Sequence, residues 1–260
     1  MTDLINPLYT VSGLAIGFLV GLTGVGGGSL MTPLMVLVFG MHPTAAVGTD
    51  LIYASATKTV GTGVHGWRRT VDWGIVRRLA MGSVPASAAT MFILWRSGVN
   101  LDARHGLVTT VLGAALILTA IAIIFRQRIV DAFAARGIEP APGRAGAVTV
   151  LLGAVMGVLV SISSVGAGAI GVTVLMILYP KMPVNRLVGS DIAHAVPLTL
   201  LAGLGHWMMG TVNWTLLVTL LMGSIPGIII GSLLAARTPD GVLRPILAGT
   251  LALVGGKLLT

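Results

Sequence analysis

Apolar runs of about 20 residues cover nearly the whole chain, with short polar loops between them. A run of that length is what an α-helix needs to cross the hydrocarbon of a bilayer. In the first half the runs occupy 8–39, 45–64, 79–95 and 106–125, and the longest polar stretch follows them at 126–146. The first run is too long for one upright helix. The pattern predicts an all-α integral membrane protein whose surface faces lipid.

A cluster of glycines interrupts the first apolar run. Residues 21–29 read G-L-T-G-V-G-G-G-S, and each glycine costs a helix about 1 kcal/mol relative to alanine. We therefore expect the helix to unwind here, which a membrane tolerates only where protein or water lines the backbone. Residues 161–168, S-I-S-S-V-G-A-G, repeat the interruption in the second half. Such a pair of interrupted segments indicates the substrate site of a transporter.

The second half of the chain copies the first. At an offset of 140 or 141 residues, Gly13 and Gly17 recur as Gly153 and Gly157, G-T-D at 48–50 as G-S-D at 189–191, and G-S-V-P at 82–85 as G-S-I-P at 223–226. A repeat of this kind divides one domain internally and does not make two. We interpret residues 1–260 as a single transmembrane domain that contains repeat 1 (8–125), a linker (126–146) and repeat 2 (147–260).

The positions of Lys and Arg distinguish two arrangements of the halves. If each broken run enters and leaves on one side, each half has three full spans, the halves are inverted, and the charges divide twelve against three. If each broken run crosses once, the halves are parallel and the division is nine against six. The positive-inside rule favours the first arrangement. We expect inverted repeats, each with a re-entrant, glycine-broken helix pair plus three transmembrane helices.

The composition agrees with a membrane location. Only 9% of the residues are charged, against about 25% in soluble domains, and the mean hydropathy is +0.97. The net charge of +8 comes from short loops, so it indicates contact with the lipid bilayer and topology rather than nucleic-acid binding. The chain has no cysteine, which excludes disulfides and thiolate metal sites. Without a positively charged n-region before it, the first run is expected to remain in the mature protein.

The glycine clusters are candidate anion-binding elements. An unwound backbone exposes amides, and a half-helix that follows points its positive N-terminal end at the same place. The alternative is close helix packing, which the four-residue spacing of Gly13, Gly17 and Gly21 also predicts. A single cluster favours packing, but two at matching repeat positions favour binding. The predicted substrate-binding residues are Thr23, Gly24, Gly26, Gly27, Gly28, Ser29, Ser163, Ser164, Gly166 and Gly168.

Three charged residues lie inside the predicted spans. Asp50 and Asp191 are repeat equivalents, and an ionised carboxylate in hydrocarbon costs at least about 2.5 kcal/mol. Both are candidates for coupling to H⁺ or Na⁺, with a helix cap as an equally weighted alternative. Lys58 has the uncharged Thr199 as its equivalent. It either supplies positive charge to a bound anion, as a further substrate-binding residue, or extends to the membrane interface.

Two histidines end equivalent spans. His65 and His206 stand beside Trp67 and Trp207, and tryptophans at such places are typical interface anchors. The histidines are further candidates for coupling because imidazole titrates near neutral pH. The alternative is a structural role, which is the commoner one for a histidine at a helix end.

The sequence around the first glycine cluster resembles the signature of the sulfite exporter TauE/SafE family. The matching segments are G-x-x-x-G-L-T-G-V-G-G-G-S-L-M-x-P at 17–33 and x-H-P-T-A-A-V-G-T-D at 41–50. The resemblance covers nearly the whole chain, although Ala167 stands where the family often has glycine. It implies a multi-pass permease of two related halves that moves sulfite, sulfoacetate or other sulfonates, outward in some members and inward in others.

The residues predict a secondary transporter with a site at the midplane of the bacterial cytoplasmic membrane, and the family resemblance implies that it moves a small sulfur-containing anion. Since no nucleotide motif is present, the energy must come from an ion or substrate gradient or from an outside partner, and no cofactor is expected. The alternatives are a passive anion channel and a transporter of another small anion such as a carboxylate. An enzyme is disfavoured because the sequence contains neither HExxH nor GxSxG.

Overall fold

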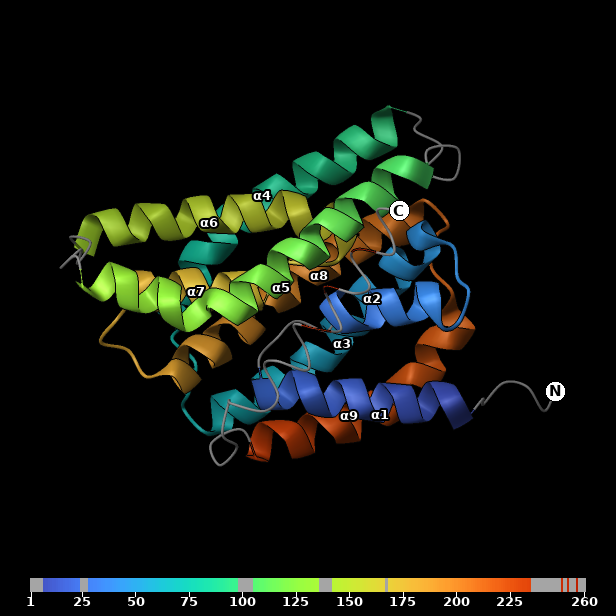
Figure 1. The fold of residues 1–260 in the computed structure, drawn as a ribbon. Coiled ribbons are helices and arrows are strands. Elements are labelled where there is room, and N and C mark those ends of the chain that lie inside the picture. The colour runs from blue at the N-terminus through green and yellow to red at the C-terminus, as the bar shows by residue number, and fades with distance from the viewer. Residues whose placement is uncertain are drawn as a thin grey trace.

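The computed structural model describes residues 7–23, 28–97, 105–135, 142–166 and 168–234, together with the single positions 249, 252 and 256. Over these residues the secondary structure is helical and contains no strand, as the sequence predicts. The helices (Figure 1) are α1 (Pro7–Thr23), α2 (Gly28–Leu37), α3 (Pro43–Trp67), α4 (Trp73–Arg96), α5 (His105–Ala135), α6 (Pro142–Ser163), α7 (Ala169–Leu178), α8 (Val184–Met208) and α9 (Trp214–Leu234).

Several of these helices can cross a bilayer. By length and composition, four qualify among the described residues: Val108–Phe133 within α5, Gly143–Ser163 within α6, α8 and α9. Helices α3 and α4, with 25 and 24 residues, are each about 36 Å long but carry more polar side chains. By contrast, α2 and α7 have only 10 residues each and are too short to span.

Each glycine-broken run forms a helical hairpin. Tyr9, near the start of α1, and Phe39, just after α2, have ring centroids 4.5 Å apart. In the second half, Thr149, in the first half of α6, lies with its hydroxyl oxygen 2.8 Å from that of Tyr179, just after α7. Each hairpin therefore begins and ends at one end of the molecule. In Figure 1, the α1–α2 hairpin opens to the right and the α6–α7 hairpin opens to the left.

The first helix of each hairpin packs on a helix of the other half. Helix α1 lies against α9, and α6 lies against α4. Glycines make this close approach possible, because an added Cβ would overlap the backbone of the facing helix. The facing pairs are Gly13 with Leu220, Gly17 with Ser224, Gly21 with Ile228, Gly153 with Leu79, and Gly157 with Ser83. The predicted glycine packing stripe is confirmed, and it joins the two halves.

Helices α3 and α8 pack in opposite directions at the centre of the bundle. Gly48, near the start of α3, faces His206, near the end of α8. Conversely, Gly189, near the start of α8, faces His65, near the end of α3. Equivalent hydrogen bonds close both ends of the pair: Asn213 N–H donates to Thr49 Oγ1 at 2.9 Å, and Asp72 N–H donates to Ser190 Oγ at 2.8 Å.

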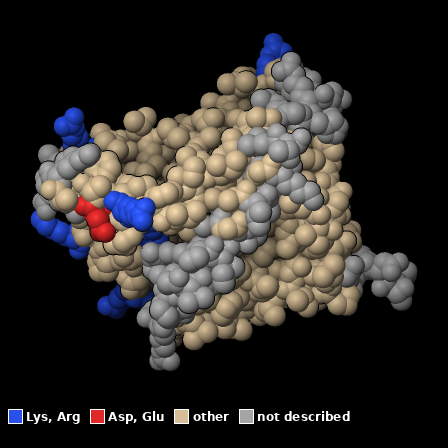
Figure 2. All heavy atoms as spheres, in the orientation of Figure 1, with Lys and Arg blue, Asp and Glu red and all other residues tan. Residues whose placement is uncertain are grey.

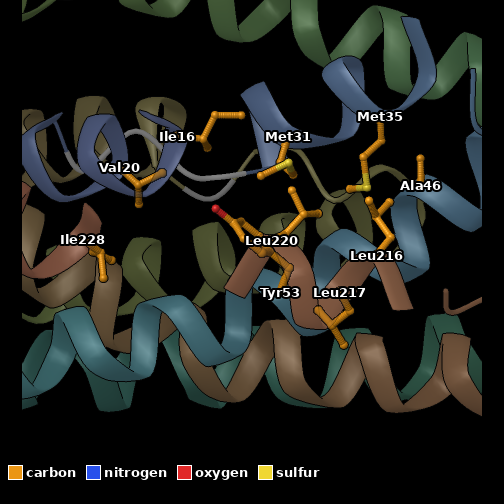
Figure 3. Packing of buried hydrophobic residues seen from close by; sticks show 10 residues of the cluster. All are labelled: Ile16, Val20, Met31, Met35, Ala46, Tyr53, Leu216, Leu217, Leu220 and Ile228. Carbon is orange, nitrogen blue, oxygen red and sulfur yellow. The ribbon is translucent and has the colours of Figure 1, made fainter. Parts of the chain in front are cut away.

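An apolar cluster fixes the short helix α2 against its neighbours (Figure 3). Met31 and Met35 of α2 are fully buried in this cluster, which α1, α3 and α9 complete. The labelled side chains are Ile16, Val20, Met31, Met35, Ala46, Tyr53, Leu216, Leu217, Leu220 and Ile228. Since Thr32 lies between the two methionines in sequence, the packing of α2 also determines where the Thr32 hydroxyl is placed.

Lys and Arg side chains gather at one end of the molecule (Figure 2). This end contains the start of α4, the start of α6 and the loop after α7, since Arg78 Nη1 donates to Tyr179 OH at 3.2 Å and lies beside Gly146. Arg186 joins them through an ion pair of 3.2 Å with Asp72. Arg96 ends α4 at the opposite end. The described residues thus have the charge asymmetry that the sequence predicts.

Candidate functional site

The second-half break has the unwound backbone that its glycines predict. Helix α6 ends at Ser163, and the next residues have left-handed φ values of +59° at Ser164, +125° at Gly166 and +122° at Gly168. Glycine adopts such values freely, whereas serine does so only under constraint. Residues held in strained backbone conformations cluster at functional sites, so Ser164 is of particular interest.

The first-half break is described only at its edges. Gly24, Gly26 and Gly27 lie outside the described residues, and of Thr23 and Gly28 only the helical backbone is described. Ser29, in the first turn of α2, is buried. In the second break, the Ser163 hydroxyl donates to Leu159 O at 2.8 Å and accepts from Val165 N–H at 3.2 Å. Ser163 therefore holds the end of α6 in place.

Asp50 connects the two halves. Its Oδ2 accepts hydrogen bonds from Thr32 Oγ1 of α2 at 2.6 Å and from Ser164 Oγ of the second-half break at 2.7 Å. The side chain is fully buried. Because α3 begins at Pro43, Asp50 lies about 10 Å inside the helix and does not cap it. The helix-cap alternative is therefore excluded for this residue.

Asp191 occupies the equivalent position of α8 but has different surroundings. It is fully buried, and neither of its carboxylate oxygens has a hydrogen-bond partner in the described part of the chain. Gly171, in the first turn of α7, leaves room for it, since a Cβ there would lie 2.5 Å from Asp191 Oδ1. Thr173, the equivalent of Thr32, donates to Ala169 O of its own helix at 2.6 Å instead.

Lys58 is buried in the electrostatic field of both carboxylates. It is 2% exposed and is attracted by Asp191 and Asp50 at longer range, since no ion pair joins it to either aspartate among the described residues. Extension of the side chain to the membrane interface is therefore excluded, because a side chain that reaches the interface must be exposed. A buried ammonium needs such partners, since charge removed from water is costly unless it is paired. Asp50, Lys58 and Asp191 form what we call the central charge group.

His194 belongs to the same region and was missed by the sequence reasoning. It is fully buried on α8, its Nε2 lies 2.8 Å from Ser83 Oγ, and it interacts electrostatically with Lys58. Its Nδ1 has no partner among the described atoms. The available signal was its spacing of three residues from Asp191, which places both side chains on one face of a helix.

His65 and His206 lie at opposite ends of the α3–α8 pair. Their Nδ1 atoms are 2.9 Å from Thr70 Oγ1 and 3.2 Å from Thr211 Oγ1, and both threonines belong to the turn that follows each helix. No hydrogen bond joins either histidine to Asp50 or Asp191 within the described chain. The four residues predicted for coupling thus separate into two aspartates at the centre and two histidines that contact the turns after α3 and α8.

The central charge group brings charged and polar side chains together inside the bundle. It offers one ammonium and two carboxylates, with hydroxyl groups and the first turns of α2 and α7 close by. The described residues contain no cluster of three or more His, Cys, Asp or Glu that could hold a metal ion.

A bundle of long apolar helices around buried charges defines a multi-pass membrane protein. The chain belongs to the sulfite exporter TauE/SafE family, whose family model matches residues 9–258. The family resemblance of the glycine-rich signature is thereby confirmed.

The chain is also similar to proteins named as probable membrane transporters. The probable membrane transporter protein YjnA of Bacillus subtilis (strain 168) is 38% identical over 253 residues, which cover 95% of this chain and 97% of that protein. A probable membrane transporter protein of Xylella fastidiosa (strain 9a5c) is 28% identical and covers 87% of this chain and 83% of its own length. No solved structure matches significantly. The names indicate a membrane transporter rather than an enzyme.

The hydrogen bonds of Asp50 predict unequal effects at two equivalent threonines. Thr32→Val removes a donor to a buried carboxylate and should lower the free energy of unfolding by about 1.5–3 kcal/mol. The matched control, Thr173→Val, removes only a bond to the carbonyl of its own helix and should change it by less than about 1 kcal/mol. Unfolding temperatures of the purified variants in detergent measure the difference. Equal destabilisation by the two would contradict the importance of the Thr32–Asp50 bond.

Proposed function

We propose that the protein is a secondary transporter that moves a small sulfur-containing anion, such as sulfite or an organosulfonate, across the cytoplasmic membrane. The family and the names of the relatives support transport. The observation that carries the proposal is the bond between Ser164 of one half and Asp50 of the other, beside the buried Lys58. A transporter needs such a site, to which both halves contribute and from which each can withdraw.

The halves are proposed to be inverted in the membrane, with each hairpin re-entrant. The opposed directions of α3 and α8 and the opposite openings of the two hairpins support this (Figure 1). The end that collects Lys and Arg (Figure 2) would face the cytoplasm by the positive-inside rule. The second-half break and the start of α2 would then lie near the membrane midplane, where substrate sites of inverted-repeat transporters are formed.

Labelling of introduced cysteines tests this orientation, and the natural chain contains none that would interfere. Thr211→Cys, after α8, should react with a membrane-impermeant reagent added outside sealed cells, whereas Arg69→Cys, after α3, should react only after permeabilisation. The reason is that the two equivalent turns lie on opposite sides if the halves are inverted. Reaction of both positions from the same side would show that the halves are parallel.

The bound anion is proposed to lie beside Lys58, near the first turns of α2 and α7. Both half-helices begin at a break, and helix N-termini carry partial positive charge that favours anions. Thr32, the fifth residue of α2, bonds Asp50, and Gly171, in the first turn of α7, lies against Asp191, so the N-terminal halves of both short helices lie near the central charge group. Backbone amides and hydroxyls can surround a pyramidal or tetrahedral oxyanion, whereas a planar carboxylate is best bound by a guanidinium fork.

Replacement of the buried ammonium tests the anion site. Lys58→Met should weaken sulfite or sulfonate binding about ten- to hundredfold, because a charge-assisted contact contributes about 1.5–3 kcal/mol. Binding should persist, since the helix N-termini remain. The control Arg128→Met removes an exposed cation of α5 and should have no effect. Calorimetric titration of the purified proteins gives the affinities. Unchanged sulfite affinity in Lys58→Met, or tighter binding of acetate than of sulfite to the wild type, would overturn the anion site.

A further inference from the structure

An anion that bound alone would give the central charge group an excess of negative charge. Asp50, Lys58 and Asp191 are buried with exposures of 0%, 2% and 0%, and Lys58 interacts with both carboxylates. The other ionisable side chains on or against α8 in the described chain include His194, buried beside Ser83, and His65, which lies against Gly189. His206 lies near the end of α8, and Arg186, near its start, forms an ion pair with Asp72. The residues that α4, α6 and α7 place around His194 and Asp191 are uncharged: Ser83, Met156 and Gly171.

An added anion therefore changes the charge balance of this region. With both carboxylates ionised, one ammonium already faces two negative charges. A monovalent anion beside Lys58 would add a third, in surroundings where charges are screened far less than in water. The excess of negative charge is removed if one carboxylate takes up a proton when the anion binds. This argument rests on the proposed anion site at Lys58.

We propose that Asp191 takes up about one proton for each monovalent anion that binds at Lys58, so that anion and proton are carried together without net movement of charge. The proton comes from water on the loading side and returns to water on the release side. An O–H bond of the Asp191 carboxyl group forms and later breaks, and no other covalent bond changes. The expected substrate is therefore a monoanion, such as a sulfonate or hydrogen sulfite, rather than a dianion.

The contacts of the two aspartates assign the proton to Asp191. Asp50 keeps two hydroxyl donors, Thr32 and Ser164, and such bonds stabilise an ionised carboxylate. Asp191 has no donor on either oxygen within the described chain, so Lys58 is the main stabiliser of its negative charge. When an anion takes over the interaction with Lys58, Asp191 loses that stabilisation and protonation becomes the favourable outcome.

The same surroundings favour a proton over a metal cation. Hard cations bind through several oxygen ligands at once, and the described residues contain no cluster of acidic or imidazole ligands for one. The Lys58 ammonium would also repel a cation placed at Asp191. A proton needs only one carboxylate oxygen and neutralises the charge where it binds.

Proteoliposomes containing the wild-type protein and a trapped pH-sensitive dye test the proposal. Methanesulfonate is the probe because it remains a monoanion at every pH used. With the membrane potential clamped, proton entry and anion entry should occur in a ratio of about one to one. The rate should not respond to changes in the clamped potential or to Na⁺.

Asp191→Asn should still show a methanesulfonate-dependent thermal shift but should move anion without protons. The control Asp131→Asn, at an exposed position of α5, should match the wild type.

The outcomes separate this inference from the proposed function. Anion entry that carries current, that requires Na⁺, or that moves no protons would overturn proton coupling and leave the anion transporter standing. Proton entry retained in Asp191→Asn would overturn the assignment to that residue. The ratio of proton entry to anion entry measured with the wild type tests proton coupling even if the Asp191→Asn variant does not fold. If the wild type neither binds nor takes up methanesulfonate, sulfite or sulfoacetate, the proposed function is overturned, and the inference with it.

Discussion

The constraint on which the rest of the structure depends is the burial of one ammonium and two carboxylates in the same region of the bundle. Lys58 lies beneath a surface that faces lipid and interacts with Asp191 and Asp50. The protein must compensate these three charges internally, since an uncompensated ion in such a place costs several kcal/mol. Helices α3 and α8, which carry these residues, must therefore lie side by side, and the α2 and α6–α7 segments must reach Asp50.

Equivalent positions of the two halves make matching contacts around this group. Gly48 and Gly189 allow equivalent contacts at the two ends of the α3–α8 pair, while α1 and α6 each pack on the other half. At the centre the symmetry stops. Thr32 and Ser164 donate hydrogen bonds to Asp50, whereas Thr173 donates to a carbonyl of its own helix. The charged Lys58 has the uncharged Thr199 at the equivalent position. These differences give the two carboxylates different surroundings, so equivalent positions need not have equal roles.

The sequence was sufficient to predict the helical class, the second-half break and the burial of Asp50 and Asp191. Those features follow from local composition and from the spacing of glycines. It did not reveal that α1 packs on α9, because contacts between residues some 200 positions apart leave no local signal. Thr32 and His194 were also missed, since an isolated polar residue in an apolar run resembles packing. Only the folded arrangement shows that Thr32 reaches Asp50 and that His194 reaches Ser83.

The position of a bound anion tests the central claim most directly. Selenite has the pyramidal shape of sulfite and scatters X-rays anomalously, so crystals grown with it locate the anion without interpretation of weak density. The predicted result is an anomalous peak inside the bundle, within contact distance of Lys58 and near the first turns of α2 and α7. A peak found only at the exposed arginines of the positively charged end, with the centre empty, would contradict a transport site at the central charge group.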